Sequence, residues 1–130
     1  MTRPEVAVGA VAIHDGAVLL VRRGRGPAAG EWSVPGGRVE RGETLAAAVV
    51  REMLEETGLE AVVDRFLGWV ERIDEYHFVI LDFAVTVLDP TETPVAGDDA
   101  AEVAWVPLTE LTDTRLVDGL YDFLRDAGVL

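Results

Sequence analysis

Three glutamates lie close together near the middle of the chain, at positions 52, 55 and 56. On a helix with about 3.6 residues per turn, side chains three or four positions apart project from one side, so these carboxylates would crowd together. A divalent cation relieves their repulsion, and hard cations such as Mg²⁺ and Mn²⁺ take oxygen ligands. The spacing of Glu52, Glu55 and Glu56 therefore predicts a metal site, with a solvated acidic helix face as the alternative interpretation.

The residues around these glutamates predict a helix over about 44–57. Glu43 and Thr44 bring a negative charge and a hydrogen-bond acceptor to its first turn, where the amides are unpaired. Gly58 is typical of a C-terminal stop. We expect the acidic residues on one face and, on another, a row of side chains that packs on a sheet: Ala46, Val50, Met53 and Thr57, with Ala47 and Leu54 beside them.

The composition limits the classes of function. The chain has 130 residues, of which 49% are hydrophobic and 27% charged, and we expect residues 1–130 to form one domain. The net charge of −13 disfavours binding to nucleic acid or to anionic membranes. Without cysteine there is no disulfide, thiolate metal site or cysteine nucleophile. No signal-peptide pattern or membrane-spanning apolar run is seen, so we expect a cytoplasmic protein.

The apolar patterns predict a sheet that would position the glutamate helix. Strands are expected over 6–14, 17–23, 38–40, 59–72, 76–88 and 102–106. Asp15-Gly16 predicts a hairpin between the first two, and the strand over 59–72 is expected to be interrupted near Gly68. Residues 89–99 predict a loop long enough to close over a site. Apolar residues at helical spacing predict a second helix over 114–127, so the fold class is α/β.

Two of these strands carry candidates for contact with a substrate. Arg22 and Arg23 end the second strand before a loop rich in glycine and proline, and a guanidinium group suits paired phosphate oxygens. Exposed edge-strand charges are the alternative interpretation. His77, near the start of the strand over 76–88, is a candidate for substrate contact rather than for metal binding, with an ordinary strand residue as the alternative.

The pattern G-x5-E-x7-R-E-U-x-E-E-x-G-U, in which U is an aliphatic residue, occurs at positions 37–59. This stretch resembles the Nudix box, and Met53, which is apolar but unbranched, is its one loose fit. The W-x-x-P-G-G approach and the later E-x-x-W-V-P segment are also similar to Nudix proteins. The resemblance implies an α/β/α sandwich with a mixed central sheet. The matching residues are Gly37, Glu43, Arg51, Glu52, Met53, Glu55, Glu56, Gly58 and Leu59.

The resemblance also implies roles for single residues. Glu52 and Glu56 would be the principal metal ligands, and Glu55 would share a metal or act through water. The carbonyl oxygen of Gly36 would be a further ligand. Arg51 would orient Glu52 or Glu43 by a charge-assisted hydrogen bond.

The other roles that the resemblance implies are a general base and structural positions. Glu52 is the expected base, and Glu102 is the alternative as well as a candidate additional ligand. Asp98 and Asp99, just before Glu102, are interpreted as loop residues that favour solubility. The structural positions in the box are Gly37, Glu43 and Gly58.

The reaction implied is the Mg²⁺-dependent hydrolysis of the diphosphate bond in a nucleoside diphosphate linked to another moiety, with Mn²⁺ as a substitute. A divalent ion offsets the negative charge that repels an anionic nucleophile. ADP-ribose or a related nucleotide sugar is the expected substrate, and a nucleoside triphosphate such as oxidised dGTP is the alternative. A non-catalytic nucleotide-sensing module is a remote alternative. Similar proteins often form homodimers.

Overall fold

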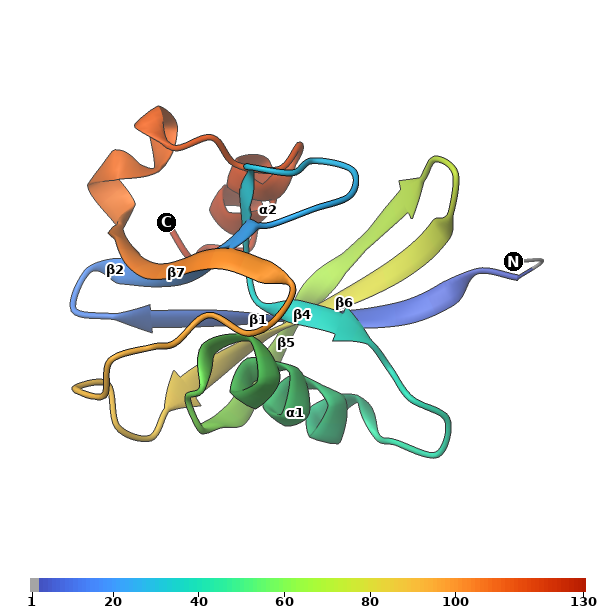
Figure 1. Cartoon of the computed structure of the whole chain (residues 1–130), viewed down its shortest axis with the longest axis horizontal. Coiled ribbons are helices and arrows are strands. Elements are labelled where there is room, and N and C mark those ends of the chain that lie inside the picture. Colours follow the sequence, from blue (N-terminus) through green and yellow to red (C-terminus); the bar gives the residue numbers. More distant parts are fainter. Residues whose placement is uncertain (1–2) are drawn as a thin grey trace.

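A computed structural model describes residues 3–130 of the chain (Figure 1). Its strands form a mixed sheet in the order β3-β2-β1-β6-β5, with β4 also paired to β1 and β7 to β2. β1 and β6 run parallel, whereas the other pairs are antiparallel. The expected mixed sheet is therefore confirmed. The strands are β1 (Glu5–His14), β2 (Ala17–Arg23), β3 (Trp32–Ser33), β4 (Gly36–Arg38), β5 (Ala61–Ile73), β6 (His77–Val87) and β7 (Ala100–Pro107).

Two α-helices lie on opposite faces of the sheet, which gives the expected α/β/α layers (Figure 1). α1 (Leu45–Thr57) covers one face, and α2 (Leu120–Asp126), which follows the 3₁₀ helix η1 (Leu108–Asp113), covers the other. Because the side chains of a strand alternate between faces, β1 contributes Val8 to the core on the α1 side and Val11 to the core on the α2 side. Within residues 3–130, no helix has the length and apolar character that a membrane crossing requires.

The predicted hairpin and the predicted interruption are both confirmed. Asp15 and Gly16 have positive φ angles of 53° and 75°, as a tight two-residue turn between β1 and β2 requires. The register of β5 against β6 shifts between Val63 and Arg65, and again just before Gly68. Such irregularities bend a strand, and the second one lies where the sequence predicts it.

The short strand predicted over 38–40 is found two residues earlier, as β4. β4 begins at the glycine turn, where its pairing with β1 starts. The first residues of the box therefore lie on the sheet rather than in a loop beside it. The paired positions are Ala7 with Arg38, Val8 with Gly37, and Gly9 with Gly36.

The helix predicted over 114–127 is wrong in its first half, since α2 begins only at Leu120. The preceding segment is extended because it pairs with β3. Trp32 N donates to Arg115 O at 2.8 Å, and Val117 N donates to Trp32 O at 2.9 Å. These bonds replace helical ones, and Gly119, with a φ of 83°, precedes the helix. The apolar spacing that predicts a longer helix comes in part from an extended segment that packs into the same core.

The predicted bounds and caps of α1 are confirmed. The Thr44 hydroxyl accepts a hydrogen bond from Ala47 N at 3.1 Å, which satisfies one free amide of the first turn. Gly58 ends the helix with a φ of 73°, and its N–H donates to Leu54 O at 2.9 Å.

The packing face of α1 is rotated from the predicted one. Met53 and Thr57 are buried as expected, together with Ala48 and Val49, but the other predicted members are exposed: Ala46, Ala47, Val50 and Leu54. Positions 49, 52, 53 and 56 share one side of a helix. The side chains of Glu52 and Glu56 therefore lie next to the buried residues instead of on a separate face. Contacts between this side of α1 and the turn at β4 fix the rotation.

Candidate metal and nucleotide site

Arg51 is the centre of an ion-pair network at the corner between α1 and β4. Its Nε and Nη2 donate to the two oxygens of Glu43 at 2.7 and 2.9 Å. Its Nη1 donates to Glu52 Oε1 at 2.8 Å and to Glu55 Oε1 at 3.2 Å, while Nη2 also donates to the Arg38 carbonyl at 3.0 Å. A single guanidinium group therefore holds three carboxylates and the backbone of β4 in fixed positions.

Glu43 is the most firmly bound partner of Arg51. Its hydrogen bonds with the Arg51 side chain, and with the amide of Glu40, lower the pKa of the Glu43 carboxyl from 4.5 to about 2. The same ion pairs raise the pKa of Arg51 well above its ordinary value. This geometry would suit the structural role predicted for Glu43 and the orienting role predicted for Arg51, and both roles stay predictions.

Glu56 lies on the other side of the same corner. Its Oε1 accepts a hydrogen bond from Gly36 N at 2.8 Å. Burial raises the pKa of Glu56 to about 7, although the Gly36 amide opposes the shift, and the nearby charge of Glu52 raises it further. Burial also raises the pKa of Glu52, against the effect of Arg51. Two carboxylates thus lie in a place where their negative charge is costly.

The two glycines of the turn are required for different reasons. A Cβ on Gly37 would lie 2.6 Å from the carboxyl group of Glu52, so the turn forms a cradle that only glycine leaves open for this side chain. A Cβ on Gly36 would lie 2.1 Å from the Val8 carbonyl oxygen. Close packing on β1 therefore explains the glycine at position 36, apart from the backbone ligand that the resemblance implies there.

The donor set at this corner fits a hard divalent cation in its chemistry. Carboxylate and carbonyl oxygens are the ligands that Mg²⁺ and Mn²⁺ prefer, and the cost of burying Glu52 and Glu56 as anions falls when a cation is near. Among residues 3–130, no three His, Cys, Asp or Glu side chains are close enough together to hold a metal ion. The reason is visible in the contacts, because Arg51 draws Glu52 and Glu55 toward itself while Glu56 faces Gly36.

The two candidate arginines at the end of β2 have different surroundings. Arg22 forms an ion pair with Glu102 on β7 at 3.2 Å. Arg23 donates to the Pro27 carbonyl at 3.1 Å, and its charge lowers the pKa of Glu56. Arg23 is therefore the candidate whose charge acts on the box corner, whereas Arg22 is already neutralised by a carboxylate.

The acidic residues of the later loop are also distributed differently from the sequence-based expectation. Glu102, the candidate base and ligand, forms an ion pair with Arg22 on β2. Asp99, interpreted from sequence as a loop residue that favours solubility, lies near Glu56, because its charge raises the pKa of Glu56. Arg25 holds Asp99 at 2.7 Å. Proximity of Asp99 to the box could not be read from sequence, because it depends on how the loop before β7 folds back.

His77 is not brought to the box corner. It lies at the hairpin end of β6, opposite Ile73, and its Nε2 is 3.7 Å from Glu71. The strand position level with Gly36 is Asp82, five residues away, which is roughly 17 Å along an extended strand. This placement gives no support to a substrate contact by His77.

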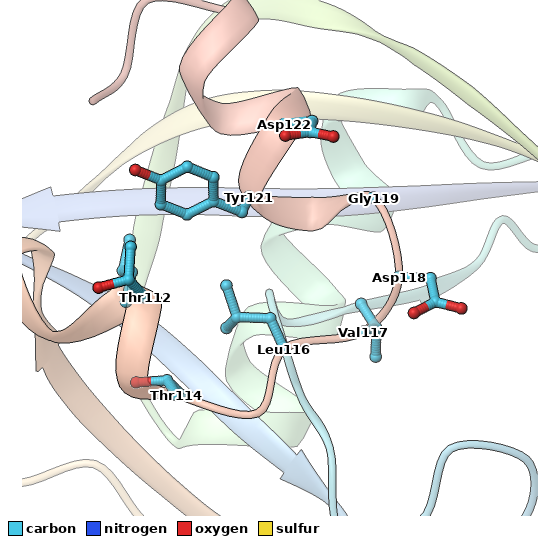
Figure 2. A pocket seen from close by; sticks show the side chains of 9 residues that line it. Thr112, Thr114, Leu116, Val117, Asp118, Gly119, Tyr121 and Asp122 are labelled. Carbon is cyan, nitrogen blue, oxygen red and sulfur yellow. The ribbon is translucent and has the colours of Figure 1, made fainter.

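Two shallow cavities lie outside the box. One, of about 320 Å³, is formed by η1, the extended segment after it and the start of α2, and it includes Tyr121 and Asp118. Figure 2 shows the side chains around it. The other, of about 370 Å³, lies over β7 and β3 and includes Trp32, Trp105 and Glu102. Neither is lined by Glu52 or Glu56, so the box corner is separate from both cavities.

Comparisons with known proteins agree with this geometry. A family model described as the NUDIX domain matches residues 3–127. An ADP-ribose pyrophosphatase of Methanocaldococcus jannaschii is 39% identical over 111 residues, which are 83% of this chain, and the chain spans 64% of that relative's length. A putative 8-oxo-dGTP diphosphatase 2 of Mycobacterium tuberculosis is 43% identical over 127 residues, which are 94% of this chain and 86% of that protein.

The fold is also shared with solved structures. The crystal structure of a MutT NUDIX hydrolase from Burkholderia pseudomallei matches with a TM-score of 0.81 and 29% identity, over 95% of this chain and 97% of that one. The matched length and the Arg51-centred corner agree with the box pattern in the sequence. This chain therefore belongs to the Nudix hydrolase family.

Proposed function

We propose that the chain is a metal-dependent pyrophosphohydrolase, which cleaves the diphosphate bond of a nucleoside diphosphate derivative. The observation that carries the proposal is the box corner, where Glu52 and Glu56 lie beside a glycine turn, with Glu52 held by Arg51 and Glu56 by the Gly36 amide. Membership of the Nudix hydrolase family supports it, as do two relatives named for reactions of this kind.

Glu52, Glu56 and the Gly36 carbonyl would hold the cation, with Glu55 as a further ligand. Mg²⁺ is the expected ion and Mn²⁺ its substitute. When bound, the ion offsets the charge of the diphosphate and makes a nearby water more acidic. Arg51 keeps Glu52 in place, so its loss would misplace a ligand without removing it.

Glu52 is the favoured general base. Arg51 engages its Oε1 atom, and within residues 3–130 no hydrogen bond to its Oε2 atom is formed, which leaves this oxygen for the proton of an attacking water. Glu102 is the alternative, although its ion pair with Arg22 would have to open first. Asp99 is a further candidate, since its charge acts on Glu56.

Arg23 is favoured over Arg22 for contact with a substrate phosphate. Within the described residues 3–130, its guanidinium group forms one hydrogen bond, to the Pro27 carbonyl, and keeps further donors for phosphate oxygens. Arg22 would first have to give up Glu102. A positive charge next to the box corner also offsets part of the repulsion between an anionic substrate and this acidic chain.

ADP-ribose or a related nucleotide sugar is the proposed substrate. The similarity to an ADP-ribose pyrophosphatase over 83% of the chain supports it. A second candidate, hydrolysis of a nucleoside triphosphate such as oxidised dGTP, is favoured by a different observation. The relative named as a putative 8-oxo-dGTP diphosphatase is 43% identical and covers 94% of the chain. The non-catalytic sensing module finds less support, because every carboxylate of the box is present.

The homodimer stays a prediction. β5 is the last strand of the sheet order, and Phe66, Trp69 and Ile73 on it are 49%, 59% and 67% exposed. A second copy would cover such apolar side chains and the free strand edge. Light scattering at several protein concentrations measures whether a dimer forms.

A substrate panel tests the proposed function. ADP-ribose, NADH, GDP-sugars, dGTP and oxidised dGTP are incubated with the protein in Mg²⁺, in Mn²⁺ and in chelator, and the phosphate-containing products are measured. We expect metal-dependent cleavage, with ADP-ribose leading and AMP among the products. A wide lead for dGTP or oxidised dGTP would select the second candidate. Absence of metal-dependent cleavage of every substrate would contradict the proposed reaction.

A further inference from the structure

Asp82 is a buried carboxylic acid for which neither the fold nor the box chemistry provides a partner. It interrupts the apolar run of β6 and is 5% exposed. Within residues 3–130, its carboxyl group has no hydrogen bond or ion pair, and burial alone raises its pKa from 3.8 to about 6. Buried carboxylates are normally paired, because an unpaired one destabilises the fold. Among residues 3–130, the fully buried side-chain atoms without a hydrogen-bond partner are on Glu5 and His77 and not on Asp82. The Asp82 oxygens therefore reach the surface, where a group outside the protein can bind them.

The carboxyl group of Asp82 points toward the box turn. Gly36, Gly9 and Asp82 lie level with one another on the adjacent strands β4, β1 and β6. A Cβ built on Gly9 would lie 2.0 Å from Asp82 Oδ1, so the Asp82 side chain occupies the space above Gly9. It therefore leans across β1 in the direction of β4. At two strand spacings, the α-carbons of Asp82 and Gly36 are about 10 Å apart.

Apolar groups flank this carboxyl group on the face of the sheet opposite α1. Val34 Cγ2 lies 3.2 Å from the same Gly9 Cβ position, next to Asp82 Oδ1. On the other side of Asp82, Gly68 pairs with it on β5, and the ring of Phe123 lies 3.2 Å from a Cβ built there. Both Val34 and Phe123 belong to the apolar cluster on the α2 side. The carboxyl group thus lies beside an aliphatic side chain, and an aromatic ring lies over the neighbouring strand on the same face. Apolar surroundings with one polar group suit a flat ring that has polar atoms on its edge.

We propose that Asp82 is a specificity-determining residue, which accepts a hydrogen bond from an amino group on the nucleobase of the substrate. The proposal rests on the proposed function, because it assumes that the diphosphate lies at the box corner. The α-carbon of Asp82 is about 10 Å from that of Gly36 at the corner, across β1. The remainder of a nucleotide can extend from the corner toward Asp82. Adenine and guanine both carry an exocyclic amino group, so the same acceptor would serve either candidate substrate.

An alternative explanation is that Asp82 only serves the fold. A structural carboxylate would be expected to bind a backbone amide, a hydroxyl group or a cation, as Glu43 does with Arg51. Asp82 has no such partner within residues 3–130. If Asp82 served only the fold, replacing it would change stability but leave the preference among nucleobases unchanged. Measuring a preference rather than an activity therefore separates the two explanations.

The test measures discrimination between paired nucleotides. Binding to metal-free protein is measured by calorimetry for AMP against purine riboside monophosphate, and for GMP against IMP, since the second member of each pair lacks the amino group. The wild-type chain is compared with Asp82→Leu and with Asp82→Asn, which keeps an acceptor oxygen. Asp64→Asn is the matched control, because Asp64 is exposed on β5 and bonds to Thr86.

We expect the wild-type chain to bind the amino-bearing member of one pair about tenfold or more tightly. Asp82→Leu should reduce this preference to within about twofold, Asp82→Asn should keep part of it, and Asp64→Asn should leave it unchanged. The pair that shows the preference identifies the base as adenine or guanine. An equal preference in Asp82→Leu, or no preference in either pair for the wild-type chain, would overturn the proposal.

The same variants are assayed for turnover, so that failure of the inference and failure of the proposed function can be distinguished. If the wild-type chain cleaves a diphosphate substrate but Asp82→Leu keeps the base preference, only the role of Asp82 is wrong. If no diphosphate substrate is cleaved, the proposed function is wrong, and the binding measurements alone decide whether Asp82 recognises a base. Thermal unfolding of each variant shows whether it is folded under the assay conditions.

Discussion

The box corner and the Asp82 position both hold acidic side chains at buried or partly buried positions, and they do so in opposite ways. At the corner, Arg51 contacts Glu43, Glu52 and Glu55 within 3.2 Å. At the centre of β6, Asp82 is more completely buried and has no partner in the part of the chain that the structure describes. One region pairs its charges within the protein, while the other leaves a carboxyl group without a protein partner among the described residues.

The difference concerns what each region is built to do. A carboxylate that must hold a cation in a fixed place needs a neighbour that orients it. Arg51 orients Glu52 by a charge-assisted hydrogen bond. A carboxylate that recognises a ligand must stay unpaired until the ligand arrives, and the free protein is less stable for that reason. The predictions below change one side chain, or the metal ion, at a time in the two regions.

Loss of Arg51 should have the largest effect on stability. Arg51→Met leaves Glu43 and Glu52 close together without a cation, and we expect a fall in the free energy of unfolding of about 2–4 kcal/mol. Turnover should fall about 100-fold, because Glu52 is no longer oriented. Arg125→Met is the control, since its ion pairs with Asp122 and Asp126 are exposed and worth less than about 1 kcal/mol. Equal destabilisation by the two variants in urea unfolding would contradict the central place given to Arg51.

Divalent cation should stabilise the box corner. At a Mg²⁺ concentration about 100 times its dissociation constant, the free energy of unfolding should rise by about 2.7 kcal/mol. The rise should disappear in Glu56→Gln and persist in Asp82→Asn, because only the first variant changes a proposed ligand. Unfolding curves in Mg²⁺ and in chelator measure this. A metal effect that survives Glu56→Gln would place the cation elsewhere.

Asp82→Asn should make stability less dependent on pH. Because burial raises the pKa of Asp82 from 3.8 to about 6, the folded chain resists ionisation of this group and loses stability as pH rises between these values. The loss is complete above about pH 6. The Asn variant lacks it and should be more stable than the wild-type chain at pH 7, by at most about 3 kcal/mol, with the difference vanishing near pH 4. A pH-independent difference would mean that Asp82 is already paired.

Glu43→Gln should show the opposite pH dependence and the smallest effect. Arg51 lowers the pKa of Glu43 from 4.5 to about 2, so the ion pair stabilises the fold above pH 4.5 and is lost as pH falls toward 2. The variant should be less stable than the wild-type chain at neutral pH and equal to it near pH 2. Urea unfolding at a series of pH values measures the difference. A gap that stays constant down to pH 2 would assign the effect to packing.

The sequence predicts most of the fold because its local signals agree with each other. Asp15-Gly16, the caps of α1 and the interruption at Gly68 each lie where local backbone chemistry requires them. The second helix is predicted too long because residues 114–118 satisfy their backbone by pairing with β3. Pairing between segments so far apart in sequence leaves no local pattern, so spacing alone could not reveal it.

The candidate site is predicted well where residues are close in sequence and less well where they are not. The contact of Arg51 with Glu55, four residues later, follows from helical spacing. Its contact with the adjacent Glu52 does not, because neighbouring residues on a helix point in different directions. The rotation of α1 and the charge of Asp99 near Glu56 depend on distant segments. Asp82 does carry a sequence signal, as an acidic residue between the apolar stretches 78–81 and 83–85, but that signal alone does not say whether the carboxyl has a partner.

Mg²⁺-dependent turnover of Glu56→Gln tests the central claim most directly, since Glu56 is a proposed ligand that the Arg51 network does not hold. The amide keeps the size of the side chain but loses the charge, and we expect turnover to fall at least about 1,000-fold with the fold intact. Glu60→Gln, an exposed acid just beyond the box, should retain wild-type turnover. Unchanged turnover in Glu56→Gln would contradict the assignment of the box corner as the metal site.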